Sequence, residues 1–194
     1  MKRPVGSILQ RHTRLIAVIL FLLLLFTVFE LSGFRSHFTL AYLQQAIRAH
    51  LVGGLLIFIL GFTLGNLIQI PGWIFLAAAV LALGELWGGI ATYIAACVSC
   101  VVTFLTIRGL GGNALRKLVS PVAVKLFGRL DAHPIKSILL LRMLFQTLPA
   151  LNYSLAMSGV GFRAYLIGTL LGLPLPIALY CIFFDSLAKA LKLA

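Results

Sequence analysis

The chain has 194 residues, of which 61% are hydrophobic and only 10% are charged. Average proteins are about half apolar and about a quarter charged, so this composition excludes an ordinary soluble domain and predicts an all-α integral membrane protein. The 16 Lys and Arg outnumber the 4 Asp and Glu, giving a formal net charge of +12. No RNA-binding signature accompanies these bases, so we expect the membrane and its anionic lipids, and no nucleic acid, as partners.

We expect residues 1–50 to form an N-terminal unit. Bases at Lys2, Arg3, Arg11 and Arg14 lie before or at the edge of an apolar run over about residues 15–31. The run is too long for a typical signal-peptide core and no clear A-x-A cleavage site follows it, which predicts a retained signal anchor. Residues 36–50 have one apolar and one more polar side, which predicts a short interfacial helix.

The main domain, residues 51–194, opens with an apolar span over 51–68. An unusual segment follows over about residues 69–85. Pro71 and Gly72 favour a turn, and roughly 14 apolar residues follow before Glu85, too few for a full crossing. This segment therefore predicts a re-entrant hairpin, whose backbone must be covered by protein or water.

Residues 86–107 are long enough to span a bilayer. After them, residues 113–131 show apolar and basic sides that predict an amphipathic surface helix bent at Pro121. The last span is expected over about residues 164–187, where Pro174 and Pro176 should kink or loosen the helix.

A second broken segment covers about residues 137–160. It is apolar, yet it contains Arg142, Pro149 and Asn152 where a simple spanning helix would carry leucine. We interpret it as a second re-entrant hairpin.

The two broken segments align as an internal repeat. With Pro71 placed on Pro149, three further pairs coincide: Phe75 with Tyr153, Glu85 with Arg163, and Trp87 with Tyr165. Many transporters contain two inverted copies of one unit whose broken helices meet near the midplane. The alternative is chance similarity in an apolar sequence. Small-residue pairs that favour close helix packing also recur, at Gly61/Gly65, Gly84/Gly88 and Gly168/Gly172.

Metal and catalytic motifs are missing from the sequence. Cys97 and Cys100 form a C-x2-C pair inside an apolar helix, and Cys181 stands alone. Without a second pair or a His cluster these cysteines are packing residues, so we expect no metal and no other cofactor. No H-E-x-x-H, G-x-S-x-G or carboxylate pair occurs, so we expect no enzyme activity.

Two blocks carry a family resemblance that covers roughly residues 60–185. The blocks are PGWIFLAAAVLALGELWGG and LLLRMLFQTLPALNYSLAMSGV. They resemble the two blocks of the DedA superfamily, also called SNARE-associated or VTT-domain membrane proteins. The resemblance implies a helical domain with two facing re-entrant hairpins in an inverted repeat.

The same resemblance implies lipid translocation, as in bacterial carriers of polyprenyl phosphate and eukaryotic phospholipid scramblases. The implied functional residues are Arg142, Pro149 and Asn152, with Pro71 and Gly72. The best-known bacterial branch has acidic residues near the first Pro-Gly, where this chain has Asn66 and Trp73, and a second Arg where it has Leu151-Asn152. The chain therefore resembles the scramblase-like branch more closely.

The chemistry of these residues suits an anionic headgroup. Arg142 can bind a lipid phosphate with its planar fork, and Asn152 can donate to a phosphate oxygen. The expected substrate is an anionic phospholipid or a polyprenyl-phosphate lipid in the cell membrane of a bacterium. The alternatives are that Arg142 is an interfacial anchor, that Asn152 caps the hairpin, and that Glu85 and Arg163 are either a pair or two separate interfacial charges.

Two other functions stay open. A proton-coupled transporter of a small solute would need a buried titratable relay, for which the sequence offers Glu85. A scaffold that only binds anionic membrane would not need Arg, Pro and Asn at membrane depth. Sidedness also presents a conflict: with a cytoplasmic N-terminus, two crossings, a hairpin and a third crossing place the basic segment 108–142 outside, against the positive-inside rule. Either residues 69–84 cross fully, or the amphipathic helix is an exception to that rule.

Overall fold

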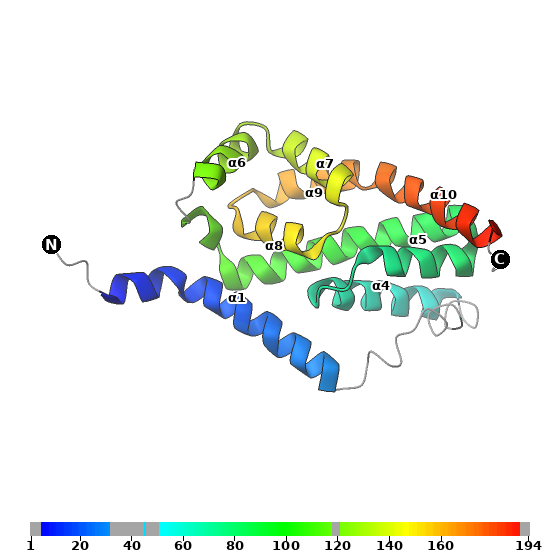
Figure 1. The fold of residues 1–194 in the computed structure, drawn as a ribbon, viewed down its shortest axis with the longest axis horizontal. Helices are drawn as coiled ribbons and strands as arrows, with labels where there is room; N and C mark the ends of the chain where they lie inside the picture. Colours follow the sequence, from blue (N-terminus) through cyan, green and yellow to red (C-terminus); the bar gives the residue numbers. More distant parts are fainter. Residues whose placement is uncertain (1–4, 32–44, 46–50, 118–120, 191–194) are drawn as a thin grey trace.

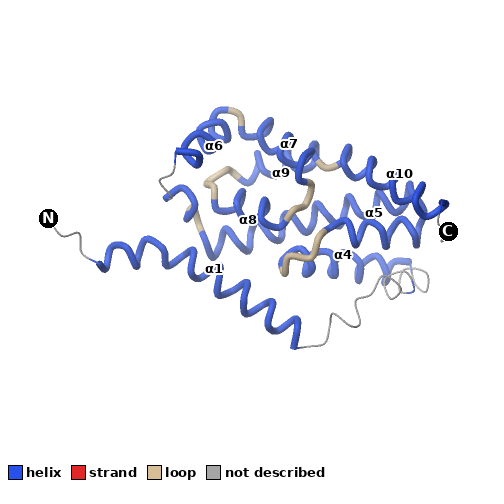
Figure 2. The backbone as a smooth tube through the Cα atoms, viewed as in Figure 1, coloured by secondary structure: helices blue, strands red, loops and turns tan. Residues whose placement is uncertain are grey.

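A computed structural model describes residues 5–31, 45, 51–117 and 121–190. The predicted interfacial helix over 36–50 lies outside the described residues apart from Gln45. The regular secondary structure in the described part of the chain is all helical, with short turns and loops between the helices (Figures 1 and 2). Its elements are α1 Val5–Leu31, α4 Leu51–Leu67, α5 Gly72–Gly111, the 3₁₀ turn η1 Ala114–Lys117, α6 Pro121–Ala132, α7 Pro134–Phe145, α8 Pro149–Met157, α9 Phe162–Gly172 and α10 Pro174–Ala190.

The outer surface of this bundle is apolar. Large side chains such as Leu24, Leu86 and Leu144 are 64%, 70% and 75% exposed. An aqueous surface does not tolerate so many exposed large apolar groups, whereas lipid does. Residues 72–111 and 162–184 are long and apolar enough to cross a membrane. Both are interrupted helices: the second breaks at Pro174, as its proline predicted.

The long helix α5 folds back on itself at Gly84. Gly84 has φ 80° and ψ 175°, outside the helical region, and a residue with a Cβ would be strained there. A Cβ at Gly88 would lie 2.7 Å from the backbone of Ala79, a distance that a continuous helix cannot give to residues nine apart. We therefore describe two arms, α5a (residues 72–83) and α5b (residues 85–111).

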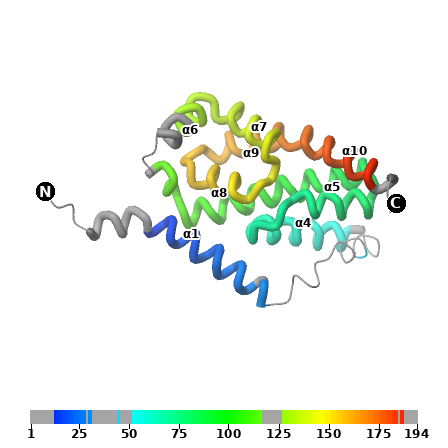
Figure 3. Tube along the Cα trace, viewed as in Figure 1, coloured from blue at the N-terminus to red at the C-terminus, as the bar shows by residue number. Residues whose placement is uncertain are grey.

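Each half of the domain follows the same order of elements. A helix ends at a turn, a proline begins a shorter helix, and a second turn leads into a longer helix (Figure 3). Gln69 (φ 74°) and Gln146 (φ 48°) are the non-glycine residues with positive φ in the described chain, and each closely precedes one of these prolines. Because proline cannot continue a helix and disfavours helical geometry before it, the chain turns at both places. An unbroken helix through either proline segment would have overturned the repeat, and neither segment is one.

The two turns meet halfway along α5b. At the end of α4, Asn66 Nδ2 donates to Ser99 Oγ at 2.8 Å, and on α8 Asn152 Oδ1 accepts from Cys100 Sγ at 3.6 Å. Gly72, which starts α5a, is in contact with Thr147 of the second turn. Because Ser99 and Cys100 lie near the middle of α5b, neither α4 nor α8 reaches past its centre.

α4 and α7 approach this centre from opposite ends of α5b. Leu55 of α4 and Leu83, beside the Gly84 bend, line one cavity. At the other end, Arg116 of η1 binds the carbonyl of Ser158, the residue that follows α8. Figure 1 shows α4 with α5a at the C-terminal side of the molecule, and α6, α7 and α8 toward the N-terminal side.

This arrangement corrects one expectation about crossings. The sequence predicted that residues 51–68 cross fully, but α4 stops beside Ser99. α1 begins at the same end as the α5–α7 connection, because Arg14 contacts Gly112 and Val18 packs on Gly111. The N-terminal half of α1 and the basic 108–142 segment therefore lie at the same end of the fold.

The paired glycines allow α7 and α9 to pack closely. A Cβ at Gly168 would lie 2.7 Å from Ile138 Cβ, and one at Gly172 would lie 2.7 Å from Arg142 Cβ. Helices in lipid associate through such close packing because burying apolar surface gains nothing there. These contacts hold α7, and with it Arg142, against α9.

Replacing Gly172 with alanine should force α7 and α9 apart. The added methyl group would also lie 2.9 Å from the Leu139 carbonyl oxygen, so we expect a loss of about 1–3 kcal/mol in the free energy of unfolding in detergent. Gly109→Ala is the matched control, since nothing lies within 4 Å of its Cβ position. It should keep or raise stability, by up to about 1 kcal/mol. Equal unfolding curves for wild type and Gly172→Ala would contradict this packing.

Candidate functional site

A cavity of about 350 Å³ lies where the two proline turns meet. We call it the proline pocket. Pro71 and Gly72 form one side, the second turn forms another, and the start of α10 completes the wall. Its lining residues are Pro71, Gly72, Trp73, residues 143–149, Pro176, Leu179 and Tyr180. Three of the predicted site residues, Pro71, Gly72 and Pro149, thus come together although they are far apart in the sequence.

Helix N-termini point into this region. α5a begins at Gly72 and α8 at Pro149, and neither N-terminus has a capping hydrogen bond from its N-cap side chain. The first backbone N–H groups of a helix lack partners within the helix and carry a partial positive charge. The described lining of the pocket contains no acidic side chain. At the start of α5a the Gly72 and Trp73 N–H groups have no hydrogen-bond partner among the described residues, whereas at the start of α8 Pro149 has no N–H and later N–H groups of the first turn donate to the Leu148 carbonyl. The pocket therefore presents positive potential from both helix starts and free donors from α5a, which favour an anion.

Arg142 lies behind the wall of the pocket and is fully buried. Its Nε donates to Thr169 Oγ1 at 3.2 Å, its Nη1 to the Gln146 carbonyl at 2.9 Å, and its Nη2 to the Tyr165 hydroxyl at 2.8 Å. All three acceptors are neutral. A buried cation usually has a charged partner, since its burial is costly, so Arg142 leaves a positive charge that these protein partners do not neutralise.

The position of Arg142 decides between the sequence alternatives for it. A side chain that snorkels to an interface would be exposed at its tip, whereas Arg142 is 0% exposed. Its bond to Gln146 O supports the positive-φ turn that forms one wall of the pocket. Arg142 is thus separated from the cavity by the backbone of this turn, close enough to act on it by charge but without lining it.

Asn152 belongs to the same buried polar cluster. Its Oδ1 lies 3.3 Å from the Tyr165 hydroxyl and 3.6 Å from Cys100 Sγ. Its Nδ2 is buried and has no hydrogen-bond partner among the described residues. The side chain faces α5b and α9 and does not cap the break at Pro149.

Tyr153 and Tyr165 are site residues that the sequence did not identify. The Tyr153 hydroxyl lies 2.7 Å from the carbonyl of Leu67 and 3.2 Å from that of Asn66, and so satisfies the end of α4. The Tyr165 hydroxyl accepts from Arg142 and lies 3.0 Å from the Cys100 carbonyl. The repeat alignment contained both tyrosines, but opposite Phe75 and Trp87, which gave no sign that the hydroxyl groups matter.

Glu85 and Arg163 lie far from each other and from the proline pocket. Glu85 lines a groove of about 630 Å³ with Cys181 of α10. Arg163 follows Phe162, whose ring centroid lies 5.8 Å from that of Phe104. Since Phe104 is 19 residues beyond Glu85 on α5b, the two charges are separated by about 28 Å along the helix axis. The structure therefore favours two separate surface charges over a pair.

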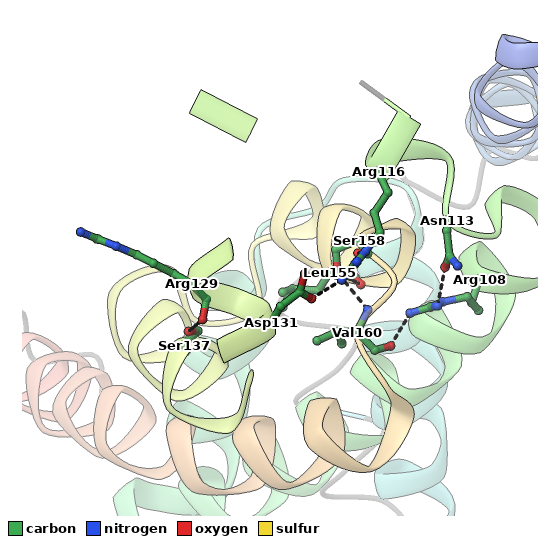
Figure 4. A network of polar contacts seen from close by, with 9 residues as sticks. All are labelled: Arg108, Asn113, Arg116, Arg129, Asp131, Ser137, Leu155, Ser158 and Val160. Carbon is green, nitrogen blue, oxygen red and sulfur yellow. Dashed lines mark hydrogen bonds and ion pairs between the residues drawn. The ribbon is translucent and has the colours of Figure 1, made fainter. Parts of the chain in front are cut away.

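A second polar cluster surrounds the turn between α8 and α9 (Figure 4). Arg108 donates to the Val160 carbonyl at 2.5 Å and to Asn113 Oδ1 at 2.7 Å. Arg116 donates to the Ser158 carbonyl and forms an ion pair with Asp131. These bonds fix the end of α8 that is farther from the pocket. Within the described residues no group of three His, Cys, Asp or Glu side chains could hold a metal ion.

Comparison with known protein families identifies the VTT domain over residues 70–186. This match covers more than half of the chain, from the first proline turn into α10. Neither the curated proteins nor the solved structures that were compared gave a match.

Replacing Tyr165 with phenylalanine should weaken the buried cluster. The change leaves Arg142 Nη2 and the Cys100 carbonyl each one partner short, which should cost about 1–3 kcal/mol of unfolding free energy. Tyr180→Phe is the matched control, because that side chain is 43% exposed and surface changes stay within about 0.5 kcal/mol. Chemical unfolding in detergent compares the two variants, and an equal effect would show that the Tyr165 hydroxyl is not a structural partner of Arg142.

Proposed function

Because the chain belongs to the VTT-domain (DedA/SNARE-associated) family of membrane proteins, we propose that it translocates an anionic lipid whose headgroup passes through the proline pocket. The observation that carries the proposal is the pocket itself: two uncapped helix N-termini face it, and the buried cation Arg142 stands behind its wall. The substrate class is an anionic phospholipid or a polyprenyl-phosphate lipid.

The proposal places the two proline segments in the membrane as facing re-entrant hairpins of an inverted repeat. α5b has 27 residues from 85 to 111 and is therefore about 40 Å long, enough to cross a hydrocarbon core of about 30 Å. The turns meet beside Ser99 and Cys100, near the middle of this length. α4–α5a and α7–α8 would then enter from opposite faces, and the pocket would lie near the midplane.

An anion at this depth would offset the cost of Arg142. A charged Arg at the centre of a spanning helix costs about 2.5–3.5 kcal/mol on insertion scales. A lipid phosphate in the pocket would interact with the guanidinium across the Gln146 backbone and with the N–H groups at Gly72 and Trp73. The barrier for a charged headgroup would thus be lowered at the point where lipid alone offers nothing polar.

The lipid tails would stay in the bilayer while the headgroup moves. Apolar side chains beside the pocket are open to the surroundings: Trp73, Phe145 and Leu148 are 50%, 50% and 47% exposed. They provide a lateral passage between the turns and α10. Equilibration of lipid between leaflets then needs no coupling to protons, and the described pocket lining offers no acidic side chain that could relay them.

The rival functions find less support in this geometry. A proton-coupled transporter would need Glu85 at the substrate, but Glu85 lies with Cys181 in a different groove. A scaffold that only binds membrane would have no use for a pocket between two broken helices or for a buried cation with neutral partners.

Removing the charge of Arg142 should slow translocation. We expect Arg142→Ala, reconstituted in vesicles, to move a fluorescent anionic phospholipid about a hundredfold more slowly, the rate equivalent of about 2.7 kcal/mol. Arg129→Ala is the control, since this exposed arginine lies far from the pocket in α6. Unchanged translocation by folded Arg142→Ala would remove Arg142 from the mechanism.

A second variant separates function from folding. Gln146→Gly removes the amide side chain from the pocket wall while glycine accepts the positive φ of the turn. We expect stability close to that of the wild type and slower translocation in the same vesicle assay. If this variant and Arg142→Ala both translocate at the wild-type rate, the pocket is not the path of the headgroup.

A further inference from the structure

Within the described part of the chain, most of the bases lie in elements at one end of the fold. Arg11 and Arg14 lie in the first half of α1, and Arg163 lies at the start of α9. The connection from α5 to the first turn of α7 adds Arg108, Arg116, Lys117, Lys125, Arg129 and Lys136, with Asp131 as its one acid. The described elements at the Gly84 end carry Glu85, Asp185 and Lys189. Among the described residues, the two ends therefore differ in charge.

The tertiary contacts bring these separate segments together. Arg14 touches Gly112 at the end of α5b. Arg108 reaches the Val160 carbonyl and Arg116 reaches the Ser158 carbonyl, so α5, η1 and the α8–α9 turn lie at one end (Figure 4). α9 starts from this turn and carries Arg163 with it.

Part of this charge is available to a partner outside the protein. Asp131 neutralises Arg116, and Arg108 is held by the neutral oxygens of Asn113 and Val160. The side chains of Arg129, Lys136 and Arg163 are exposed, and Arg129 points away from the polar network in Figure 4. Arg129, Lys136 and Arg163 thus form no ion pair among the described residues.

We propose that this basic end rests in the headgroup layer of an anionic leaflet and faces the cytoplasm. Clustered Lys and Arg beside membrane spans bind anionic lipids, with about 1 kcal/mol per base near the surface. Short basic segments at the ends of spans also stay on the cytoplasmic side. The exposed bases would contact lipid phosphates without carrying them across. This interaction does not depend on lipid translocation, because none of these residues lines the proline pocket.

A lipid-binding experiment tests whether the partner of the basic end is an anionic lipid. The full chain in nonionic detergent is titrated with phosphatidylglycerol or phosphatidylcholine while its unfolding midpoint is followed. Phosphatidylglycerol should raise the midpoint more, and the difference should shrink with added salt. Replacing Arg129, Lys136 and Arg163 with Gln should weaken the apparent phosphatidylglycerol affinity by about fivefold per charge, or roughly a hundredfold in total.

A matched pair of variants makes this test specific. Lys136→Gln and Lys189→Gln remove the same charge from the two ends of the molecule, and only Lys136→Gln should weaken phosphatidylglycerol binding. Equal stabilisation by the two lipids, or equal losses in the two variants, would overturn the proposal. Translocation is measured separately, so failure here leaves the proline pocket untouched.

Chemical labelling tests the orientation. In a variant whose Cys97, Cys100 and Cys181 are replaced by serine, single cysteines are introduced as Gly128→Cys in α6 or Ser186→Cys in α10, both at exposed positions. A membrane-impermeant maleimide on spheroplasts should label the Ser186→Cys protein and reach the Gly128→Cys protein only after permeabilisation. The reverse pattern would overturn the proposal.

Discussion

The carbonyl groups at the ends of α4 and α7 need hydrogen-bond partners, and the rest of the structure depends on this constraint. Both helices stop near the middle of α5b, where the chain packs around them and water is excluded, so the broken backbone needs hydrogen-bond partners from the protein. The Tyr153 hydroxyl, from the opposite half of the domain, satisfies the end of α4. Arg142 binds the Gln146 carbonyl just beyond the end of α7. Each break is therefore stabilised by a side chain that is held in place to donate a hydrogen bond to the carbonyl that the break leaves free.

The site follows from the same constraint. Arg142 also donates to Thr169 and Tyr165 of α9, which requires α7 to lie close to α9, as Gly168 and Gly172 permit. The helices that restart at Gly72 and Pro149 both begin where the turns touch, and Gly72 and Trp73 supply unpaired N–H groups there. The groups that repair the broken backbone and the groups that attract an anion are thus neighbours. We propose that a lipid headgroup uses this polarity to pass.

Local chemistry made part of this predictable from the sequence. A proline cannot continue a helix that precedes it, so Pro71 and Pro149 indicated the two turns, and the paired glycines indicated close packing. The sequence did not show that α4 stops halfway, because an apolar run of this length reads the same whether or not it crosses. It suggested Glu85 and Arg163 as a possible pair, yet the fold places Glu85 beside Cys181 and Arg163 near Phe104, toward opposite ends of α5b. The role of Tyr153 depends on a contact with Leu67, 86 residues away, which no local pattern reports.

The depth of the first proline turn tests the central claim most directly, and the chain contains only two tryptophans, Trp73 and Trp87, to report it. Both are exposed at the surface, by 50% and 65%. Trp73 follows the turn, whereas Trp87 lies beside the Gly84 bend. Fluorescence quenching by phosphatidylcholines brominated at different acyl positions measures each one in a Trp87→Phe or Trp73→Phe variant. If the turn lies near the midplane, bromine at the chain ends quenches Trp73 most strongly, and bromine near the headgroup quenches Trp87 most strongly. Equal, shallow quenching of both would contradict it.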